Sequence, residues 1–279
     1  MKTITKELVR QLLPHRPPDG HKGTFGKVYV LGGAVGYTGA PVFAGEAAVR
    51  TGSGLVFAGV PESVYAIVAA RCTCVMAQPI PEDYPVLLAR LQACSAVCIG
   101  PGLEPGPRAE QTVLSLLRDL SCPVVLDAGG INAVAAHIDV LEERKAPTAV
   151  TPHDGEFQRL CGTVRQDREQ SAAEFAARYG CVLVRKGPGT IVAAPDGRRL
   201  RNPTGNCGMA KGGSGDVLAG MILSLLGQGA EPFEAAAAAV WLHGRAGDLC
   251  ARELTEYAMT PADLIDRLPA VFRELEMEN

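Results

Sequence analysis

The chain has 279 residues, of which 20% are charged and 5% aromatic, and its formal net charge is −3. This composition provides neither the basic surface nor the aromatic platforms typical of a nucleic-acid-binding protein. The longest apolar stretches are too short to span a bilayer, and the first residues lack the apolar core and cleavage site of a signal peptide. We therefore expect a cytoplasmic protein with no nucleic-acid or membrane partner.

The nine cysteines include one close pair, Cys72 and Cys74, and no second pair at zinc-site spacing. An odd number without an export signal indicates reduced thiols, and most of them are expected to be small core residues. Only Cys207 lies in a glycine-rich loop, so it is the one cysteine expected to touch a functional site.

Short apolar runs alternate with helical patterns along most of the chain. Residues 1–13 carry apolar side chains at helical spacing. The runs expected to be strands each end in glycine or proline, and they cover residues 27–33, 55–60, 96–102, 123–130, 148–152 and 181–187. The patterns between and after them predict helices at 40–52, 110–120, 169–180, 217–229, 232–253 and 260–276.

Two details refine this pattern. Pro232 and Pro261 stand where the last two helices would begin. Residues 189–203 are instead expected to form a hairpin with Asp196 and Gly197 at its turn.

Apolar strands separated by helices predict a parallel sheet covered on both faces. With no linker and no internal repeat, we expect one domain over residues 1–279. Its fold is expected to be α/β, a three-layer α/β/α sandwich with a mostly parallel central sheet. Ligands of such sheets bind beyond the carboxyl ends of the strands, so the glycine-bearing strand ends should converge on one edge.

The usual nucleotide fingerprints are missing from the sequence. GxxxxGK[ST] does not occur, and Gly100–Gly106 departs from GxGxxG in its last spacing. The stretch from Gly205 to Ile222, GNCGMAKGGSGDVLAGMI, has five glycines in its first eleven residues and then becomes apolar. Free N–H groups at the start of a helix there would hold an anion.

Asp216 ends the glycine cluster, and its residue type admits two interpretations. An aspartate at this place is often the cap of the following helix. Beside a bound phosphate, it would instead accept the proton of a substrate hydroxyl as that hydroxyl attacks phosphorus.

The stretch GNCGMAKGGSGDVLAG resembles the signature loop of the ribokinase-like NAD(P)H-hydrate dehydratases. Other stretches resemble later or earlier motifs of that family in the right order: residues 21–56, CIGPGLEPG (98–106), VVLDAGGIN (124–132), TPHDGEF (151–157) and KGPGT (186–190). The resemblance covers roughly residues 21–245. In this family the domain is often fused to an epimerase, which these residues do not include, so the resemblance implies the stand-alone dehydratase.

The resemblance implies nicotinamide-nucleotide repair. The enzyme would use ADP, or ATP, with Mg²⁺ to phosphorylate the hydroxyl of the S epimer of hydrated NADH or NADPH (NADHX or NADPHX). Elimination of phosphate would then restore the reduced cofactor, and AMP would be released. The family further implies a homotetramer and functional pairing with a separate epimerase. Two alternatives stay open, a ribokinase-like kinase for a vitamin precursor or sugar, and a catalytically silent nucleotide-binding module.

The resemblance assigns roles residue by residue. Asp216 would bind the substrate and take the hydroxyl proton, while the N–H groups of Gly213 and Gly215 stabilise the transferring phosphoryl group. Family substrate contacts match Ala40, Gly102 and His153. The AMP moiety would contact Gly215 and the segment Lys186, Gly187, Pro188, Gly189 and Thr190. Glu156 would act on magnesium through water.

The residue types alone leave simpler roles open. Ala40 suits a helix start equally well, a lone histidine such as His153 is more often structural, and Lys186 could equally be a solvated strand-end lysine. Zinc at His153, Asp154 and Glu156 is disfavoured because no fourth ligand stands nearby. Gly129 departs from the family, which often has a second acid at this position, and its presence is expected to weaken metal or phosphate binding.

Overall fold

The computed structural model describes residues 1–162 and 167–276. Its strands are β1 (Lys2–Thr3), β2 (Lys27–Leu31), β3 (Leu55–Val60), β4 (Met76–Pro79), β5 (Ala96–Ile99), β6 (Val124–Leu126), β7 (Thr148–Val150), β8 (Val182–Arg185), β9 (Ile191–Ala193) and β10 (Arg199–Arg201). The first helices are α1 (Lys6–Leu12), α2 (Gly39–Arg50), α3 (Glu62–Arg71), α4 (Tyr84–Gln92), α5 (Pro107–Asp119), α6 (Ala128–Val134) and α7 (Val140–Glu143). They are followed by α8 (Asp154–Cys161), α9 (Arg168–Tyr179), the 3₁₀ turn η1 (Cys207–Met209), α10 (Ser214–Gly227), α11 (Pro232–Ala258) and α12 (Pro261–Glu276).

The strands form one sheet in the order β1-β10-β9-β8-β7-β6-β5-β2-β3-β4. Seven of its nine neighbouring pairs are parallel, and only β9 runs antiparallel to both of its neighbours. The mostly parallel sheet is therefore confirmed. The hairpin is confirmed too, with Gly197 at φ +90° in its turn.

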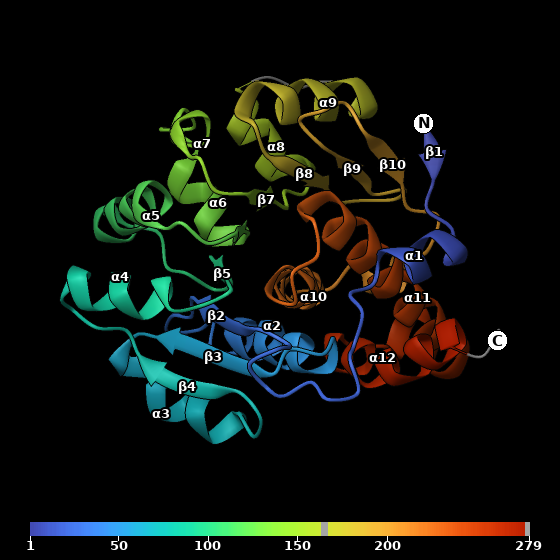
Figure 1. The fold of residues 1–279 in the computed structure, drawn as a ribbon, viewed down its shortest axis with the longest axis horizontal. Helices are drawn as coiled ribbons and strands as arrows, with labels where there is room; N and C mark the ends of the chain where they lie inside the picture. Colours follow the sequence, from blue (N-terminus) through green and yellow to red (C-terminus); the bar gives the residue numbers. More distant parts are fainter. Residues whose placement is uncertain (163–166, 277–279) are drawn as a thin grey trace.

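Side chains of each inner strand alternate between two cores. On β2, Val28 and Val30 join the core under α2, α10 and α11, whereas Tyr29 and Leu31 join the core under α4, α5 and α9. Figure 1 shows α4 to α9 outside the curved sheet and α10 and α11 inside it. The three-layer α/β/α arrangement follows from this two-sided burial.

Two strands were not predicted. β4 has the sequence MAQP and lies at one edge of the sheet with no fully buried side chain, so it lacks the apolar run of an inner strand. β1 is two residues long at the other edge. The helical spacing of apolar residues in 1–13 corresponds to α1, which begins at Lys6 after its cap Thr5, whose hydroxyl accepts the Leu8 N–H at 3.2 Å.

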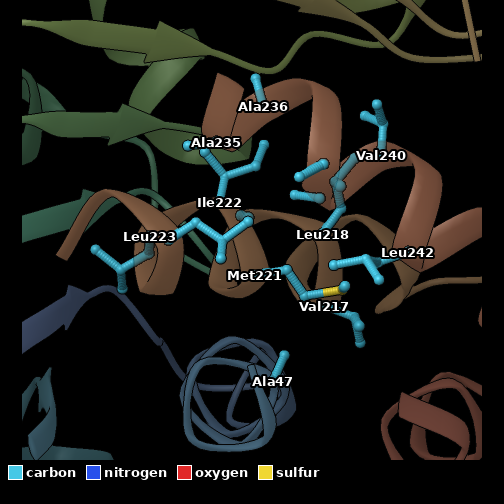
Figure 2. Close-up of a cluster of buried hydrophobic side chains, with 14 of the residues drawn as sticks. Ala47, Val217, Leu218, Met221, Ile222, Leu223, Ala235, Ala236, Val240 and Leu242 are labelled. Atoms are coloured by element: carbon cyan, nitrogen blue, oxygen red, sulfur yellow. The ribbon is translucent and has the colours of Figure 1, made fainter. Parts of the chain in front are cut away.

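Helix α10 is apolar on every side, which indicates a helix inside a core. It packs on α2, α11 and β5, and Figure 2 shows its side chains Val217, Leu218, Met221 and Ile222 among those of α11, with Ala47 of α2 below. A Cβ at Gly220 would lie 2.0 Å from the Ala44 carbonyl oxygen, so only glycine permits this approach of α2. The middle of α10 thus packs with its backbone directly against that of α2.

The last two helices begin at Pro232 and Pro261, as predicted. Helix α11 runs further than expected, to Ala258, with a kink at Thr255, where φ is +67°. Among the described residues, no helix combines the length and apolarity needed to cross a bilayer.

Candidate active site

Four chain segments meet beyond the carboxyl ends of β6, β7 and β8, at the first turn of α10. Asp127 follows β6, Thr151 follows β7 and Lys186 follows β8. A Cβ built on Gly215 would lie 3.2 Å from Lys186 Nζ and 4.0 Å from Asp127 Oδ2, so this ammonium and carboxylate border the helix start. The predicted convergence of strand ends is confirmed.

Lys186 and Asp127 form a buried ion pair. Lys186 Nζ donates to Asp127 Oδ1 at 2.7 Å, and the side chains are 18% and 2% exposed. The Thr151 hydroxyl donates to the same Asp127 oxygen at 2.6 Å, and Glu156 Oε2 lies 3.9 Å from Nζ. Burial alone would lower the pKa of Lys186, but the carboxylates of Asp127 and Glu156 outweigh it and leave that pKa raised. Lys186 is thus a charged, paired group and not a solvated strand-end lysine.

Asp127 was not singled out from the sequence as a site residue. The signal was present, because a lone acid directly after a buried strand stands at the edge where ligands bind. Its partner could not be read from the sequence, since Lys186 is 59 positions away and on a strand separated from β6 by β7.

Asp216 lies in the first turn of α10 but does not cap it. The cap is Gly213, at φ +100°, and the Asp216 carboxylate makes no hydrogen bond to any described residue. Burial, with the nearby charges of Asp127 and Glu156, raises the pKa of Asp216 to about 7, although Lys186 opposes the shift. The capping interpretation is therefore wrong, and a free acid with a pKa near neutrality stands at the helix start.

Free backbone N–H groups precede this acid at the start of the helix. In the part of the chain that the structure describes, the N–H groups of Gly212, Gly213 and Gly215 have no hydrogen-bond acceptor, whereas that of Ser214 donates to the Lys211 carbonyl at 3.2 Å. Unsatisfied N–H groups and the positive end of a helix dipole favour an anion such as phosphate. Free N–H groups, which the sequence predicts at this helix start, are thus present at Gly212, Gly213 and Gly215, while the Ser214 N–H is already bonded.

A second layer of side chains holds this turn. A Cβ at Gly213 would lie 2.9 Å from the Phe43 ring, so the backbone there is closely covered. Ser214 Oγ lies 3.4 Å from His243 Nε2, deep in the core. Burial lowers the pKa of His243 to about 4, which keeps this ring neutral behind the anion site.

Ala40 and Gly102 lie side by side. A Cβ on Gly102, where φ is +67°, would approach the Ala40 Cβ to 3.0 Å and the Tyr37 carbonyl oxygen to 2.7 Å. Tyr37 and Val35 in the same loop are 64% and 73% exposed. The two small residues predicted to contact substrate are thus brought together next to exposed apolar side chains, and their role in binding stays a prediction.

His153 caps helix α8. Its Nδ1 accepts the N–H groups of Gly155 and Glu156 at 3.0 and 3.2 Å, while Glu156 Oε2 accepts the His153 N–H at 2.8 Å. This reciprocal capping box fixes Glu156 near Lys186. The structural role of His153 is therefore present, and its contact with substrate stays a prediction.

The carboxylate of Glu156 suits a hard cation such as Mg²⁺ that takes most of its ligands from water and phosphate. Among residues 1–162 and 167–276, no three His, Cys, Asp or Glu side chains converge as a metal site. Mg²⁺ commonly keeps several waters and is held by one or two carboxylates and by phosphate oxygens. Glu156, acting through water, would hold such an ion, which would offset negative charge on phosphate. Zinc ligation does not suit these residues, because His153 Nδ1 is committed to the cap and Asp154 Oδ1 accepts from Arg185 Nε at 2.8 Å.

The segment from Lys186 to Thr190 forms a loop between β8 and β9. Gly187 and Gly189 have φ of +140° and +64°, so the loop takes a path that other residues rarely adopt. Thr190 Oγ1 donates to the Gly187 carbonyl at 2.9 Å. Gly187 and Pro188 are exposed and Gly189 and Thr190 half-buried, while Lys186 at the start of the loop reaches Asp127.

The backbone around Gly129 is closely packed. A Cβ at Gly129 would lie 2.4 Å from the Leu103 carbonyl oxygen, so this backbone excludes the acid that the family often has there.

Cys207 is exposed, and its sulfur lies 2.9 Å from Glu256 Oε2. The Cys207 thiol thus contacts the last turns of α11.

The sequence profile that describes NAD(P)H-hydrate dehydratases matches residues 28–270. The chain belongs to the NAD(P)H-hydrate dehydratase family. It is 43% identical to a bifunctional NAD(P)H-hydrate repair enzyme of Moorella thermoacetica over 99% of its length, and it spans about half (54%) of that relative. An ADP-dependent (S)-NAD(P)H-hydrate dehydratase of Bacillus subtilis is 36% identical, with 98% of both chains covered.

Solved structures agree with this membership. The Bacillus subtilis ADP/ATP-dependent NAD(P)H-hydrate dehydratase, co-crystallised with ATP and Mg²⁺, superposes with a TM-score of 0.85 at 33% identity over 98% of both chains. A ribokinase of Thermotoga maritima, 12% identical, reaches 0.57 over 88% of this chain and 99% of its own, which shows the fold alone. The ribokinase-like fold expected for this dehydratase family member is confirmed.

Proposed function

We propose that the chain dehydrates the S epimer of hydrated NADH or NADPH, with ADP as the phosphoryl donor, and releases the reduced cofactor, AMP and phosphate. The observation that carries the proposal is the unbonded Asp216 carboxylate in the same helical turn as the free N–H groups of Gly213 and Gly215. Asp216 would take the hydroxyl proton, and the N–H groups would stabilise the transferring phosphoryl group. Hydroxide is a poor leaving group and phosphate a good one, so phosphorylation makes the elimination possible.

The rest of the site receives roles within the same proposal. Ala40, Gly102 and His153 would contact the hydrated nucleotide, and residues 186–190 with Gly215 would contact the AMP moiety. Mg²⁺ near Glu156 would offset charge on the phosphates. Membership of the family and the ATP/Mg²⁺ co-crystal of the Bacillus subtilis relative support these roles.

The organisation of the protein belongs to the proposal too. We infer a single domain that acts in the cytoplasm as a homo-oligomer, expected to be a tetramer, and that works together with a separate epimerase. Relatives named bifunctional are about twice the length that this chain matches, which supports the pairing of two activities.

Purified protein is expected to restore the near-ultraviolet absorbance of reduced nicotinamide from the S hydrate when ADP and Mg²⁺ are present. Free phosphate should appear one-for-one with restored cofactor, because the phosphorylated intermediate eliminates instead of accumulating. The measurement is absorbance with a parallel phosphate assay, with ATP tested in turn. A stable phosphorylated product without an absorbance gain would indicate a kinase, and no change with either nucleotide in folded protein would contradict the proposal.

Gly189→Leu is expected to weaken ADP binding about tenfold or more, measured by calorimetry. Leucine rarely adopts the φ of +64° that Gly189 has, so the loop backbone that would meet the nucleotide should shift, and a lost hydrogen bond to a charged group costs about 1.5–3 kcal/mol. Gly197→Leu is the matched control, since Gly197 also has positive φ (+90°) but lies at the tip of the hairpin. Equal ADP affinity in Gly189→Leu and wild type would remove the loop from the nucleotide site.

A further inference from the structure

One guanidinium holds the loop that follows β8. Arg168, the first residue of α9, donates from Nη1 to the Pro188 carbonyl at 2.9 Å and from Nη2 to the Lys186 carbonyl at 2.9 Å. Its Nε lies 3.4 Å from Asp154 Oδ1, and its side chain is 26% exposed. The planar fork of an arginine suits two acceptors at fixed spacing, which a lysine ammonium cannot reproduce.

This arrangement decides where the N–H groups of the loop point. In a trans peptide group, the C=O of one residue and the N–H of the next point in opposite directions, and no described peptide bond is cis. Because the carbonyls of Lys186 and Pro188 face Arg168, the N–H groups of Gly187 and Gly189 face away from it. Within the described residues, neither N–H donates a hydrogen bond.

The glycines fit the same geometry. A Cβ at Gly187 would lie 2.7 Å from Arg168 Nη2, so the guanidinium fills the space that a side chain would need. Arg168 also reaches the start of α8, because its Nε lies 3.4 Å from Asp154 Oδ1. The same Asp154 oxygen accepts a hydrogen bond from Arg185 Nε, and Arg185 Nη1 donates to the Ser171 hydroxyl of α9 at 2.6 Å. The fork is thus held in position from α8, α9 and β8 together.

We propose that Arg168 is a positioning residue for the nucleotide: it binds the carbonyls of Lys186 and Pro188 and so presents the free N–H groups of Gly187 and Gly189 to an anionic group of ADP. Free backbone N–H groups that point the same way from a glycine-containing turn make an anion-binding concavity, and Pro188 between the two glycines has no N–H of its own. The inference rests on the proposed function, because it takes this loop as part of the nucleotide site. Arg168 itself lies on the opposite side of the loop and does not contact the nucleotide.

The test is calorimetric titration of the full chain with ADP, without the hydrated substrate. Arg168→Met keeps the apolar stem and removes the fork, and it is expected to weaken ADP binding about 10–100-fold, as expected for lost hydrogen bonds to a charged donor. Arg168→Lys, which can reach one carbonyl, should recover part of the loss. Arg178→Met is the control, because Arg178 lies on the same helix but pairs with Glu142 on the surface.

Kinetics separate positioning from general damage. In Arg168→Met, KM for ADP should rise, while kcat at saturating ADP and KM for the hydrated nucleotide stay within a few-fold of wild type. Equal ADP affinity in wild type and Arg168→Met would overturn the inference and leave the proposed function standing. If wild type bound no ADP, both would fall. Should Arg168→Met not fold, Arg168→Lys decides, since wild-type ADP affinity in that folded variant would also overturn the inference.

Discussion

Asp216→Asn is expected to lower turnover about 10²–10⁴-fold while ADP binding stays near that of wild type. The loss is the usual contribution of a general base, since asparagine has the size of aspartate but cannot accept the proton. Binding should survive because the free N–H groups belong to the backbone of Gly212, Gly213 and Gly215 and do not depend on this side chain. Turnover and calorimetric ADP affinity are the two measurements.

The pH dependence tests the same assignment. The raised pKa of Asp216, about 7, predicts that wild-type kcat falls about tenfold per pH unit below that value, as the base becomes protonated. The pKa of Asp216 in the folded protein, about 7, lies above that of a free aspartate, about 4. Ionisation of Asp216 therefore lowers the free energy of unfolding as the pH rises from about 4 to about 7. The melting temperature of Asp216→Asn at pH 8 should therefore not fall below that of wild type.

Glu234→Gln is a suitable control, because Glu234 is an acid in the first turn of the neighbouring helix α11 and is not among the charges that shift the pKa of Asp216. It should keep normal turnover and the same acid limb. Near-normal turnover in Asp216→Asn would remove Asp216 from the mechanism.

The architecture could be predicted from the sequence where single segments carry enough information. Apolar runs such as 55–60 become inner strands because both faces of the sheet are covered, so nearly every side chain must be apolar. The edge strand β4 escaped detection because none of the four side chains of its sequence, MAQP, is fully buried, so it lacks an apolar run. Local pattern thus reveals inner strands better than edge strands.

The site was predictable only in part, because its decisive contacts are long-range. The glycine cluster before Asp216 indicated an anion site, but whether Asp216 caps the helix depended on the positive φ of Gly213, which takes the cap position. The Lys186–Asp127 pair joins two strands that are not neighbours in the sheet. Arg168 acts on a loop some 18 to 20 positions away, and nothing in its local sequence marks it.

Asp127→Asn is expected to lower the free energy of unfolding by about 3 kcal/mol at pH 7. It leaves the buried Lys186 ammonium without its 2.7 Å partner and beside the positive end of the α10 dipole. Breaking a buried pair costs about 3–5 kcal/mol, and Glu156, 3.9 Å from Nζ, keeps the loss at the lower end. Urea denaturation of variant and wild type gives the difference.

Asp196→Asn is the matched control for Asp127→Asn. Asp196 pairs with Arg198 at the same 2.7 Å, but both side chains are about half exposed, so the free energy of unfolding should fall far less than in Asp127→Asn. Because the charge of Asp127 raises the pKa of Asp216, the acid limb of kcat in Asp127→Asn should move to lower pH. Equal losses of unfolding free energy in Asp127→Asn and Asp196→Asn would show that the buried Lys186–Asp127 pair stabilises the fold no more than an exposed pair does. An unmoved acid limb would show that Asp127 does not set the proton affinity of the base.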